Sequence, residues 1–185
     1  LGRWLTGNPK GDFAGKLVCH CLLIETSEGL VLVDTGLGHH DVTNSARRLG
    51  RMNRRVLGAV LDPEETALAH VNRLGFNPQD VRHIVVTHLD MDHAGGLSDF
   101  PDATLHLYRP ESRLMTQPLQ GRDRSRYRAI QWAHNPATEI YDLEGEKFFG
   151  FDAVRQLRGL PPEILLVPLP GHSEGHCGVA VQRQE

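Results

Sequence analysis

The sequence feature that most constrains this chain is a cluster of metal-binding side chains placed directly after a short apolar run. Residues 83–86 (His-Ile-Val-Val) are typical of a short buried strand. Two histidines and two aspartates follow within six positions, at 88, 90, 92 and 93. Loops at strand ends are where a rigid scaffold presents functional groups. The cluster therefore indicates a functional site built on the end of a β-sheet.

The residue types and their spacing favour a transition-metal site. Imidazole nitrogen and carboxylate oxygen together suit zinc, iron or manganese. In an extended backbone His88 and Asp90 point the same way, whereas the adjacent Asp92 and His93 diverge, which suits a second metal beside the first. The glycine pair at 95–96 permits close backbone approach. A solvated polar turn is the alternative interpretation, and a calcium loop fits less well because histidine is a poor calcium ligand.

Apolar runs alternate with helix signals, which predicts an α/β layered fold with a mixed sheet, in a single domain over residues 1–185. A hairpin is expected at the start, and one helix is expected from Asp62 to about Leu74, before Gly75. Residues 44–60 are expected to be mobile or partly helical, and residues 109–135 part helix and part loop. The expected strands are residues 17–25, 30–33, 83–86, 104–108, 164–167 and 178–181.

The composition excludes several classes of protein. Three cysteines in 185 residues exclude a disulfide framework. No apolar run approaches the roughly 20 residues of a membrane span. The net charge of -3 gives no general attraction to nucleic acid or to acidic membranes. No charged-then-apolar signal segment follows Leu1. We therefore expect a cytoplasmic protein with neither a membrane nor a nucleic acid as partner, while its oligomeric state leaves no signal in the sequence.

Four ordered segments resemble the motifs of the metallo-β-lactamase superfamily. Residues 87–96 resemble its His-x-His-x-Asp-His signature, and residues 32–36 (Leu-Val-Asp-Thr-Gly) resemble its strand-end Asp-Thr-Gly. Residues 74–81 resemble the lead-in to its metal strand, and residues 168–176 resemble its Pro-Gly-His-Thr-x-Gly segment. The resemblance implies the αββα sandwich of this superfamily, with mixed β-sheets, and a metal-dependent hydrolase.

Carried over by position, the resemblance implies a site for one or two metal ions, with zinc as the first expectation. His88 and His172 would bind the first metal, and Asp92 and His93 would bind the second. The metals would lower the pKa of a bound water to about 7 and polarise the substrate. Asp92 would also have a catalytic role, because its carboxylate would carry the proton to the leaving group.

Three further residues belong to the implied site. Asp34 would lie behind the ligands and hold the metal loop, with a helix- or turn-capping aspartate as the alternative. His176 is expected to be a pocket or structural residue. Asp90 is expected to be a metal ligand, but it stands where the usual motif has its second histidine. A carboxylate there makes the first metal position harder and more anionic, which favours iron or manganese relative to zinc.

The end of the chain bears on the second metal position. In the resembled family a bridging aspartate and a final histidine follow the segment that here ends at His176, beyond a further strand or two. This chain reaches Glu185 before either residue, and it opens at Leu1 without a methionine. We therefore expect a domain truncated after residue 185, whose continuation supplies both ligands.

The function expected is hydrolysis of an ester, lactone, thioester or related bond in a small molecule by a metal-activated water. Asp90 supports an alternative, a diiron oxidoreductase of the flavodiiron type, which resembles this chain in having a carboxylate there. A degenerate, non-catalytic metal-binding module is the third interpretation. Residues 109–128 hold six arginines and two acidic residues, which predicts either a solvated face or a cationic flap that attracts an anionic substrate.

Several histidines and cysteines lie outside these motifs. Cys19 and Cys21 share one face of the expected first strand and are interpreted as small buried residues rather than thiolate ligands. His20 would point to the opposite face, either toward the metal pocket or away from it. Cys177 is expected in the core, and His39–His40 in an exposed loop.

Overall fold

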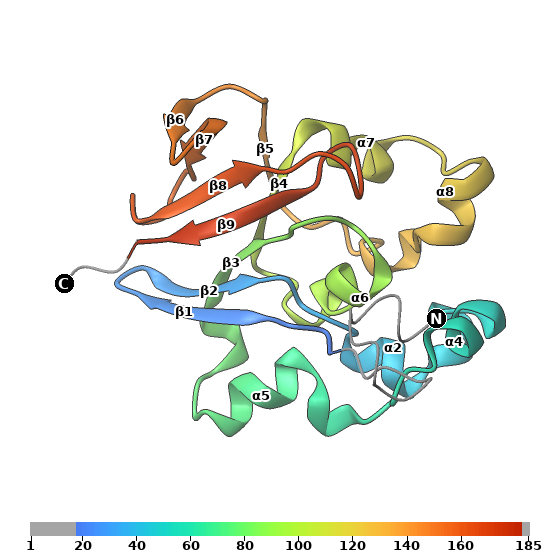
Figure 1. The fold of residues 1–185 in the computed structure, drawn as a ribbon. Helices are drawn as coiled ribbons and strands as arrows, with labels where there is room; N and C mark the ends of the chain where they lie inside the picture. The colour runs from blue at the N-terminus through green and yellow to red at the C-terminus, as the bar shows by residue number, and fades with distance from the viewer. Residues whose placement is uncertain (1–17, 183–185) are drawn as a thin grey trace, which may run out of the picture.

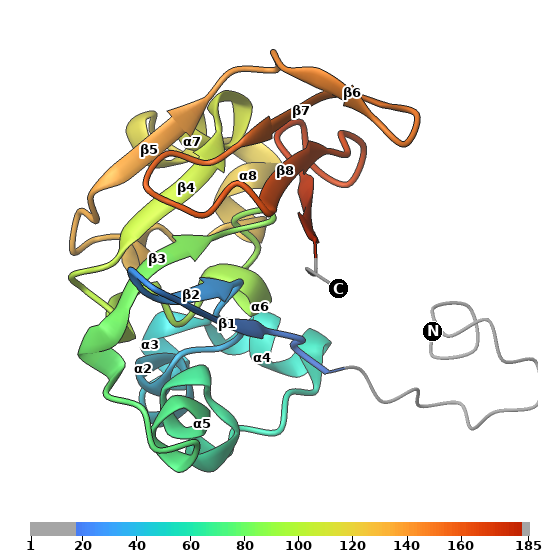
Figure 2. The same cartoon turned by 90° about the vertical axis from the view of Figure 1, so that its left-hand side faces the viewer.

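Two β-sheets packed face to face form the framework of the computed structural model, which describes residues 18–182 (Figure 1, Figure 2). The first sheet has the strand order β1-β2-β3-β4-β5 and the second has the order β6-β7-β8-β9. The strands of the first sheet are β1 Leu22–Thr26, β2 Gly29–Val33, β3 Val81–Val85, β4 Thr104–Tyr108 and β5 Thr138–Tyr141. The strands of the second sheet are β6 Glu146–Phe148, β7 Phe151–Gln156, β8 Ile164–Pro168 and β9 Cys177–Val181.

Short helices lie in the connections between the strands. The α-helices are α2 His39–Thr43, α3 Ser45–Arg48, α4 Arg51–Leu57, α5 Ala67–Arg73, α6 Met91–Ala94, α7 Arg109–Thr116 and α8 Gly121–Arg126. The 3-10 helices are η1 Pro63–Glu65, η2 Pro78–Asp80, η3 Leu97–Asp99 and η4 Ala129–Gln131. Among the helices of residues 18–182, none has both the length and the apolar character that crossing a membrane requires.

The topology of the first sheet brings several loops together. β1 and β2 form an antiparallel hairpin, whereas β2, β3, β4 and β5 pair in parallel. The carboxyl ends of parallel strands meet at the same edge of a sheet. The residues that follow β2, β3 and β4 therefore lie close together, and α6 packs at this edge (Figure 1).

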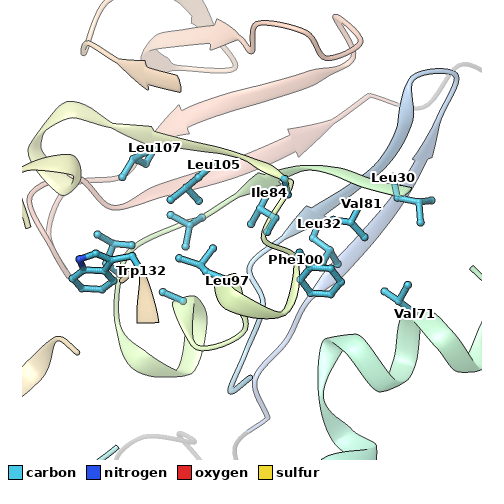
Figure 3. Packing of buried hydrophobic residues seen from close by; sticks show 14 of the residues in the cluster. Leu30, Leu32, Val71, Val81, Ile84, Leu97, Phe100, Leu105, Leu107 and Trp132 are labelled. Atoms are coloured by element: carbon cyan, nitrogen blue, oxygen red, sulfur yellow. The ribbon is translucent and has the colours of Figure 1, made fainter. Parts of the chain in front are cut away.

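The two faces of the first sheet bury different apolar clusters, because side chains alternate across a strand. Leu32, Ile84 and Leu105 pack on the helical side with residues such as Phe100 and Trp132 (Figure 3). On the other face, residues of both sheets pack together; this cluster contains Val31, Val85, Tyr108, Tyr141, Leu157, Ile164, Leu166 and Cys177. The order of layers is therefore helices, first sheet, second sheet, which agrees with the α/β sandwich expected from the sequence.

A chain of polar groups is buried in the first sheet. The Tyr141 hydroxyl accepts a hydrogen bond from the Arg158 backbone N–H (2.9 Å) and is hydrogen-bonded to His106 Nδ1 (2.8 Å). His106 Nε2 is in turn hydrogen-bonded to His83 Nδ1 (2.9 Å). His106 is fully buried, and burial, reinforced by the charges of His83 and Arg158, lowers the pKa of His106 to about 3. The ring is therefore neutral at ordinary pH and holds three strands together by hydrogen bonds.

Two expected elements differ from the structure in their boundaries. The first strand begins at Leu22 rather than residue 17; residues 18–21 are not strand, and residue 17 lies outside the described residues. Leu22 pairs with Val33, at which the partner strand ends, so residues 18–21 extend past the end of β2. The expected helix over 62–74 is divided into η1 and α5, because Thr66 takes an extended backbone and its side chain caps Ala69 N–H.

The remaining helices and strands expected from the sequence are present, but the expected set of strands was incomplete. Residues 44–60 contain α3 and α4, and residues 109–135 are part helix and part loop, as expected. The strands expected over 83–86, 104–108, 164–167 and 178–181 are present as β3, β4, β8 and β9, with shifts of one or two residues at their ends. The strands β5, β6 and β7 were not expected from the sequence, because polar residues interrupt their apolar pattern.

Candidate metal centre

Three of the expected metal ligands come together although they lie far apart in the sequence. His88 and Asp90 follow β3, and His172 lies in the loop between β8 and β9. One ligand atom from each of these residues lies within 4.8 Å of the others. Asp90 Oδ2 is 3.1 Å from His88 Nε2 and 2.9 Å from His172 Nε2. His88 is buried, whereas the side chain of His172 is 58% exposed, so the position is open to solvent on one side.

A buried atom without a hydrogen-bond partner marks this position. His88 Nε2 is shielded from solvent, and no hydrogen bond to it is formed among residues 18–182, because its close contact with Asp90 lacks hydrogen-bond geometry. Leaving such a nitrogen unpaired is costly, whereas a metal ion would satisfy it. Two imidazole nitrogens and one carboxylate oxygen are a donor set for zinc, iron or manganese. The residues present therefore fit a divalent metal.

Asp34 organises the histidines from behind. It follows β2 with a φ of 58°, and its two oxygens accept hydrogen bonds from Thr87 N–H (2.7 Å), Thr87 Oγ1–H (2.8 Å) and His93 Nδ1–H (2.8 Å). Because the Thr87 hydroxyl donates to Asp34, it accepts from His88 Nδ1–H (3.0 Å). Both rings thus carry their proton on Nδ1, which leaves Nε2 of His88 and of His93 as a free lone pair for a metal.

Asp92 and His93 lie on α6, beside the first position. The rings of His88 and His93 have centroids 4.1 Å apart, and His93 Nε2 is 3.8 Å from Asp92 Oδ2. Burial opposes a charge on His93, but the hydrogen bond and the charge of Asp34 outweigh burial and raise the pKa of His93. The side chain of Asp92 is 39% exposed. Among the described residues, this second position has these two candidate ligands.

Asp90 is held by an arginine that no motif had singled out. Arg126, the last residue of α8, donates from Nε to Asp90 Oδ1 (2.5 Å) and from Nη2 to Asp90 Oδ2 (2.7 Å). Burial of Asp90 opposes its charge, but the close contacts with His88, Arg126 and His172 hold its pKa well below the usual range. Part of the expected cationic segment therefore reaches the site itself.

Glu111 is a second residue that the sequence reading missed. It lies on α7, is 1% exposed, and accepts hydrogen bonds from Leu89 N–H (2.8 Å) and from Ser173 Oγ–H (2.7 Å). It thereby joins the loop of His88 to the loop of His172. The only signal in the sequence was an acidic residue three positions after the end of an expected strand, and that signal is too common to identify a role.

A buried network fixes the backbone around the ligands. Arg48 donates to Asp41 (2.7 Å), and Gln131 donates to the other Asp41 oxygen (2.8 Å). A side chain at Gly95 would meet Asp41 Oδ2 and the backbone of Gly36 and Met91. The close backbone approach expected for this glycine is confirmed.

The remaining candidates are distributed around the site. His176 lies beside the first position, with its ring centroid 5.1 Å from that of His88, and Nδ1–H donates to the Leu169 carbonyl (3.0 Å). Cys177 is buried, as expected. Cys19 is exposed, which corrects its interpretation as a buried residue, because residues 18–21 precede β1.

Two histidine expectations differ in detail. His20 is exposed and precedes β1. His39 and His40 begin helix α2 rather than lying in a loop; His40 is exposed, while His39 is partly buried and donates its backbone N–H to Asp99 (2.7 Å). These residues form no part of the ligand cluster described above.

Comparison with known proteins places this geometry in a family. The profile described as Metallo-beta-lactamase superfamily matches residues 14–183. A probable metallo-hydrolase of Mycobacterium tuberculosis is 44% identical over 169 residues, covering 91% of this chain and 54% of that protein. An N-acyl homoserine lactonase of Bacillus cereus is 27% identical over 172 residues, covering 89% of this chain and 58% of that protein.

A solved structure agrees with these relatives. It is an N-acyl homoserine lactone hydrolase with the product N-hexanoyl-L-homoserine bound at the catalytic metal center. It is 26% identical, has a TM-score of 0.64, and is matched over 87% of this chain and 57% of its own. The chain spans about half the length of the curated relatives it matches. Profile, relatives and fold agree with the four motifs, and the chain belongs to the metallo-beta-lactamase superfamily.

Proposed function

We propose that the protein is a metal-dependent hydrolase acting on an ester or lactone bond of a small molecule. The observation that carries the proposal is the convergence of His88 Nε2, Asp90 Oδ2 and His172 Nε2, with the first of these buried and unpaired. Family membership and relatives named as metallo-hydrolases and lactonases support the reaction class. Because one fold can serve many functions, the proposed reaction rests on the residues of the site rather than on the fold.

In this proposal His88, Asp90 and His172 hold one ion, and Asp92 and His93 contribute to a second. Zinc is the first expectation, and the carboxylate of Asp90 makes iron or manganese the alternative. A bound ion of this kind supplies Lewis acidity toward the scissile carbonyl and lowers the pKa of a water molecule.

The chain's own residues have distinct tasks in this reaction. Asp34 fixes the Nδ1 tautomer of the neutral His88 and His93 rings through the hydrogen bonds described above, so that Nε2 is the nitrogen available to a metal. Asp92 is 39% exposed, and its carboxylate can take a proton and return it to the leaving alkoxide. Glu111 keeps the loop of His172 against the loop of His88.

The substrate class follows from relatives and charge together. Because several relatives are N-acyl homoserine lactonases, a lactone is the preferred member of the proposed set. The exposed Arg124 of α8 favours a substrate with anionic or carbonyl-rich character. We propose no nucleic-acid or membrane partner.

Metal analysis and hydrolysis assays on purified protein test the proposal. We expect bound metal, and turnover of an N-acyl homoserine lactone, a simple γ-lactone or p-nitrophenyl acetate. His88→Ala should lose both, while His70→Ala, which changes an exposed histidine of α5, should lose neither. Wild-type protein without metal, or His88→Ala with full activity, would contradict the proposal.

One observation favours a second candidate. Asp90 gives the first position a carboxylate, which suits iron and therefore a diiron oxidoreductase. Iron in the purified protein together with oxygen consumption and no hydrolysis would favour this candidate. Hydrolysis without oxygen consumption would exclude it.

A further inference from the structure

The two oxygens of Asp90 have different surroundings. Oδ2 faces Nε2 of both histidines, at 3.1 Å from His88 and 2.9 Å from His172. Oδ1 accepts a hydrogen bond from Arg126 Nε, and Arg126 Nη2 reaches Oδ2 from the same side. The side chain of Asp90 is only 14% exposed, so few water molecules can replace these contacts. Arg126 therefore determines which oxygen is directed toward the histidines.

Arg126 also joins the two loops that carry the ligands. Its Nη1 donates to the backbone carbonyl of His172 (3.0 Å), while the other two nitrogens hold Asp90. A planar guanidinium that makes a two-point contact with a carboxylate fixes its orientation as well as its distance. One side chain thus sets the position of Asp90 relative to His172.

The charges add a second effect. His88 and His172 bind a metal as neutral imidazoles, whereas Asp90 carries a negative charge. The paired guanidinium cancels this charge, so that Asp90 and Arg126 together resemble one more neutral ligand. We propose that Arg126 is a positioning residue for metal binding, which acts through Asp90 and makes the Asp90–Arg126 pair the counterpart of a neutral imidazole. This inference rests on the proposed function, because it uses the same first metal position.

A double-mutant cycle distinguishes a coupled pair from two independent residues. It compares the effect of Arg126→Ala on metal affinity in the presence of Asp90 with its effect in Asp90→His. With Asp90 present, Arg126→Ala releases the carboxylate, and loss of such an outer contact weakens metal affinity by about 10- to 100-fold. In Asp90→His, the guanidinium has lost the carboxylate that it pairs with, and it repels the incoming cation. There, adding Arg126→Ala should strengthen metal binding. Removal of one side chain is thus expected to have opposite effects in the two backgrounds.

The experiment measures metal affinity of the four proteins after chelation, by zinc competition and by the absorption spectrum of bound cobalt(II). Arg122→Ala is the matched control, because Arg122 is an exposed arginine on the same helix and its removal changes the net charge equally. Its affinity should equal that of wild type. Thermal unfolding of each metal-free protein verifies folding, and the comparison within the Asp90→His background remains decisive if Arg126→Ala alone is unstable.

The outcomes separate this inference from the proposed function. If wild type binds no metal, both fail. If wild type binds metal and Arg126→Ala binds equally well or more tightly, the proposed function stands, but the positioning role is wrong. If Arg126→Ala weakens binding in both backgrounds alike, Arg126 acts independently of Asp90 and the inference is also overturned.

Discussion

Asp34→Asn is the substitution that most directly probes how the site is organised. The change preserves size, and asparagine tolerates the φ of 58° at this position. The carboxylate accepts three hydrogen bonds, from Thr87 N–H, Thr87 Oγ1–H and His93 Nδ1–H. An amide has one accepting and one donating end, so it cannot serve all three donors.

The structure predicts which contacts must reverse. To keep the Thr87 N–H bond, the amide oxygen must occupy the Oδ1 place, which puts the amide NH2 at the place of Oδ2. That group would donate to His93 Nδ1 and to Thr87 Oγ1, and the hydroxyl would then donate to His88 Nδ1. Both rings would move their proton to Nε2, which removes the lone pairs that a metal requires.

The size of the effect follows from the bonds lost. Hydrogen bonds to charged groups contribute about 1.5–3 kcal/mol each, so the free energy of unfolding should fall by about that amount for one uncompensated contact. Metal affinity should fall by about 10- to 100-fold, the usual effect of losing an outer partner of a ligand. Thr87→Val should change the proton position of His88 while leaving the direct Asp34–His93 bond in place.

Long-range proton–nitrogen NMR of the imidazole rings in metal-free protein reads the tautomers directly. Urea unfolding and zinc competition give the two free energies. Asp102→Asn is the control, since it neutralises an exposed aspartate near the amino end of β4, at the opposite edge of the sheet. Rings of His88 and His93 that remain protonated on Nδ1 in Asp34→Asn would refute the reasoning.

Three further predictions concern residues around the site and the core. Glu111→Ala leaves the Leu89 N–H unpaired, so urea unfolding should show a loss of about 1–3 kcal/mol, together with weaker metal binding; unchanged values would contradict the bridging role. Gly95→Ala forces a methyl group against Asp41, and thermal unfolding should show a loss of about 1–3 kcal/mol. His106 resists protonation down to a pKa of about 3, whereas the unfolded chain takes the proton near pH 6.5. Stability should therefore fall as pH drops through this window, by up to about 1.4 kcal/mol per pH unit. Urea unfolding between pH 4 and pH 7 gives the free energy of unfolding at each pH. This free energy should change less with pH in His106→Gln than in wild type, and an equal dependence in both proteins would exclude His106 as the cause.

The sequence predicted those parts of the site that depend on local order. The cluster from His88 to His93 directly follows a strand, and parallel pairing brings Asp34 to the same edge, so these positions follow from strand order and alternation. His172 could be placed only by resemblance, because the path of the chain across the second sheet has no local signature. The family and the fold class could therefore be predicted from the sequence.

Glu111 and Arg126 could not be predicted individually. Each acts through a contact with a loop that is distant in sequence, and a charged residue on a short helix is most often a solvated one. The strands β5, β6 and β7 were missed for a related reason. Polar residues interrupt each of these strands, and within β7 only Val154 is buried, so no apolar run marks them.

The long connection from β4 to β5 has a consequence for how proteins of this architecture can diversify. The ligand histidines are supplied by strand ends and by the β8–β9 loop, whereas residues 109–137 form a separate cover that reaches the site through a few side chains, Arg126 and Glu111 among them. Substitutions in the mostly exposed residues 117–124 of the cover can change which molecules enter without moving the ligand-bearing backbone. Selection experiments that randomise residues 117–124, while retaining these two contacts, should therefore yield altered substrate ranges more readily than changes to the sheets.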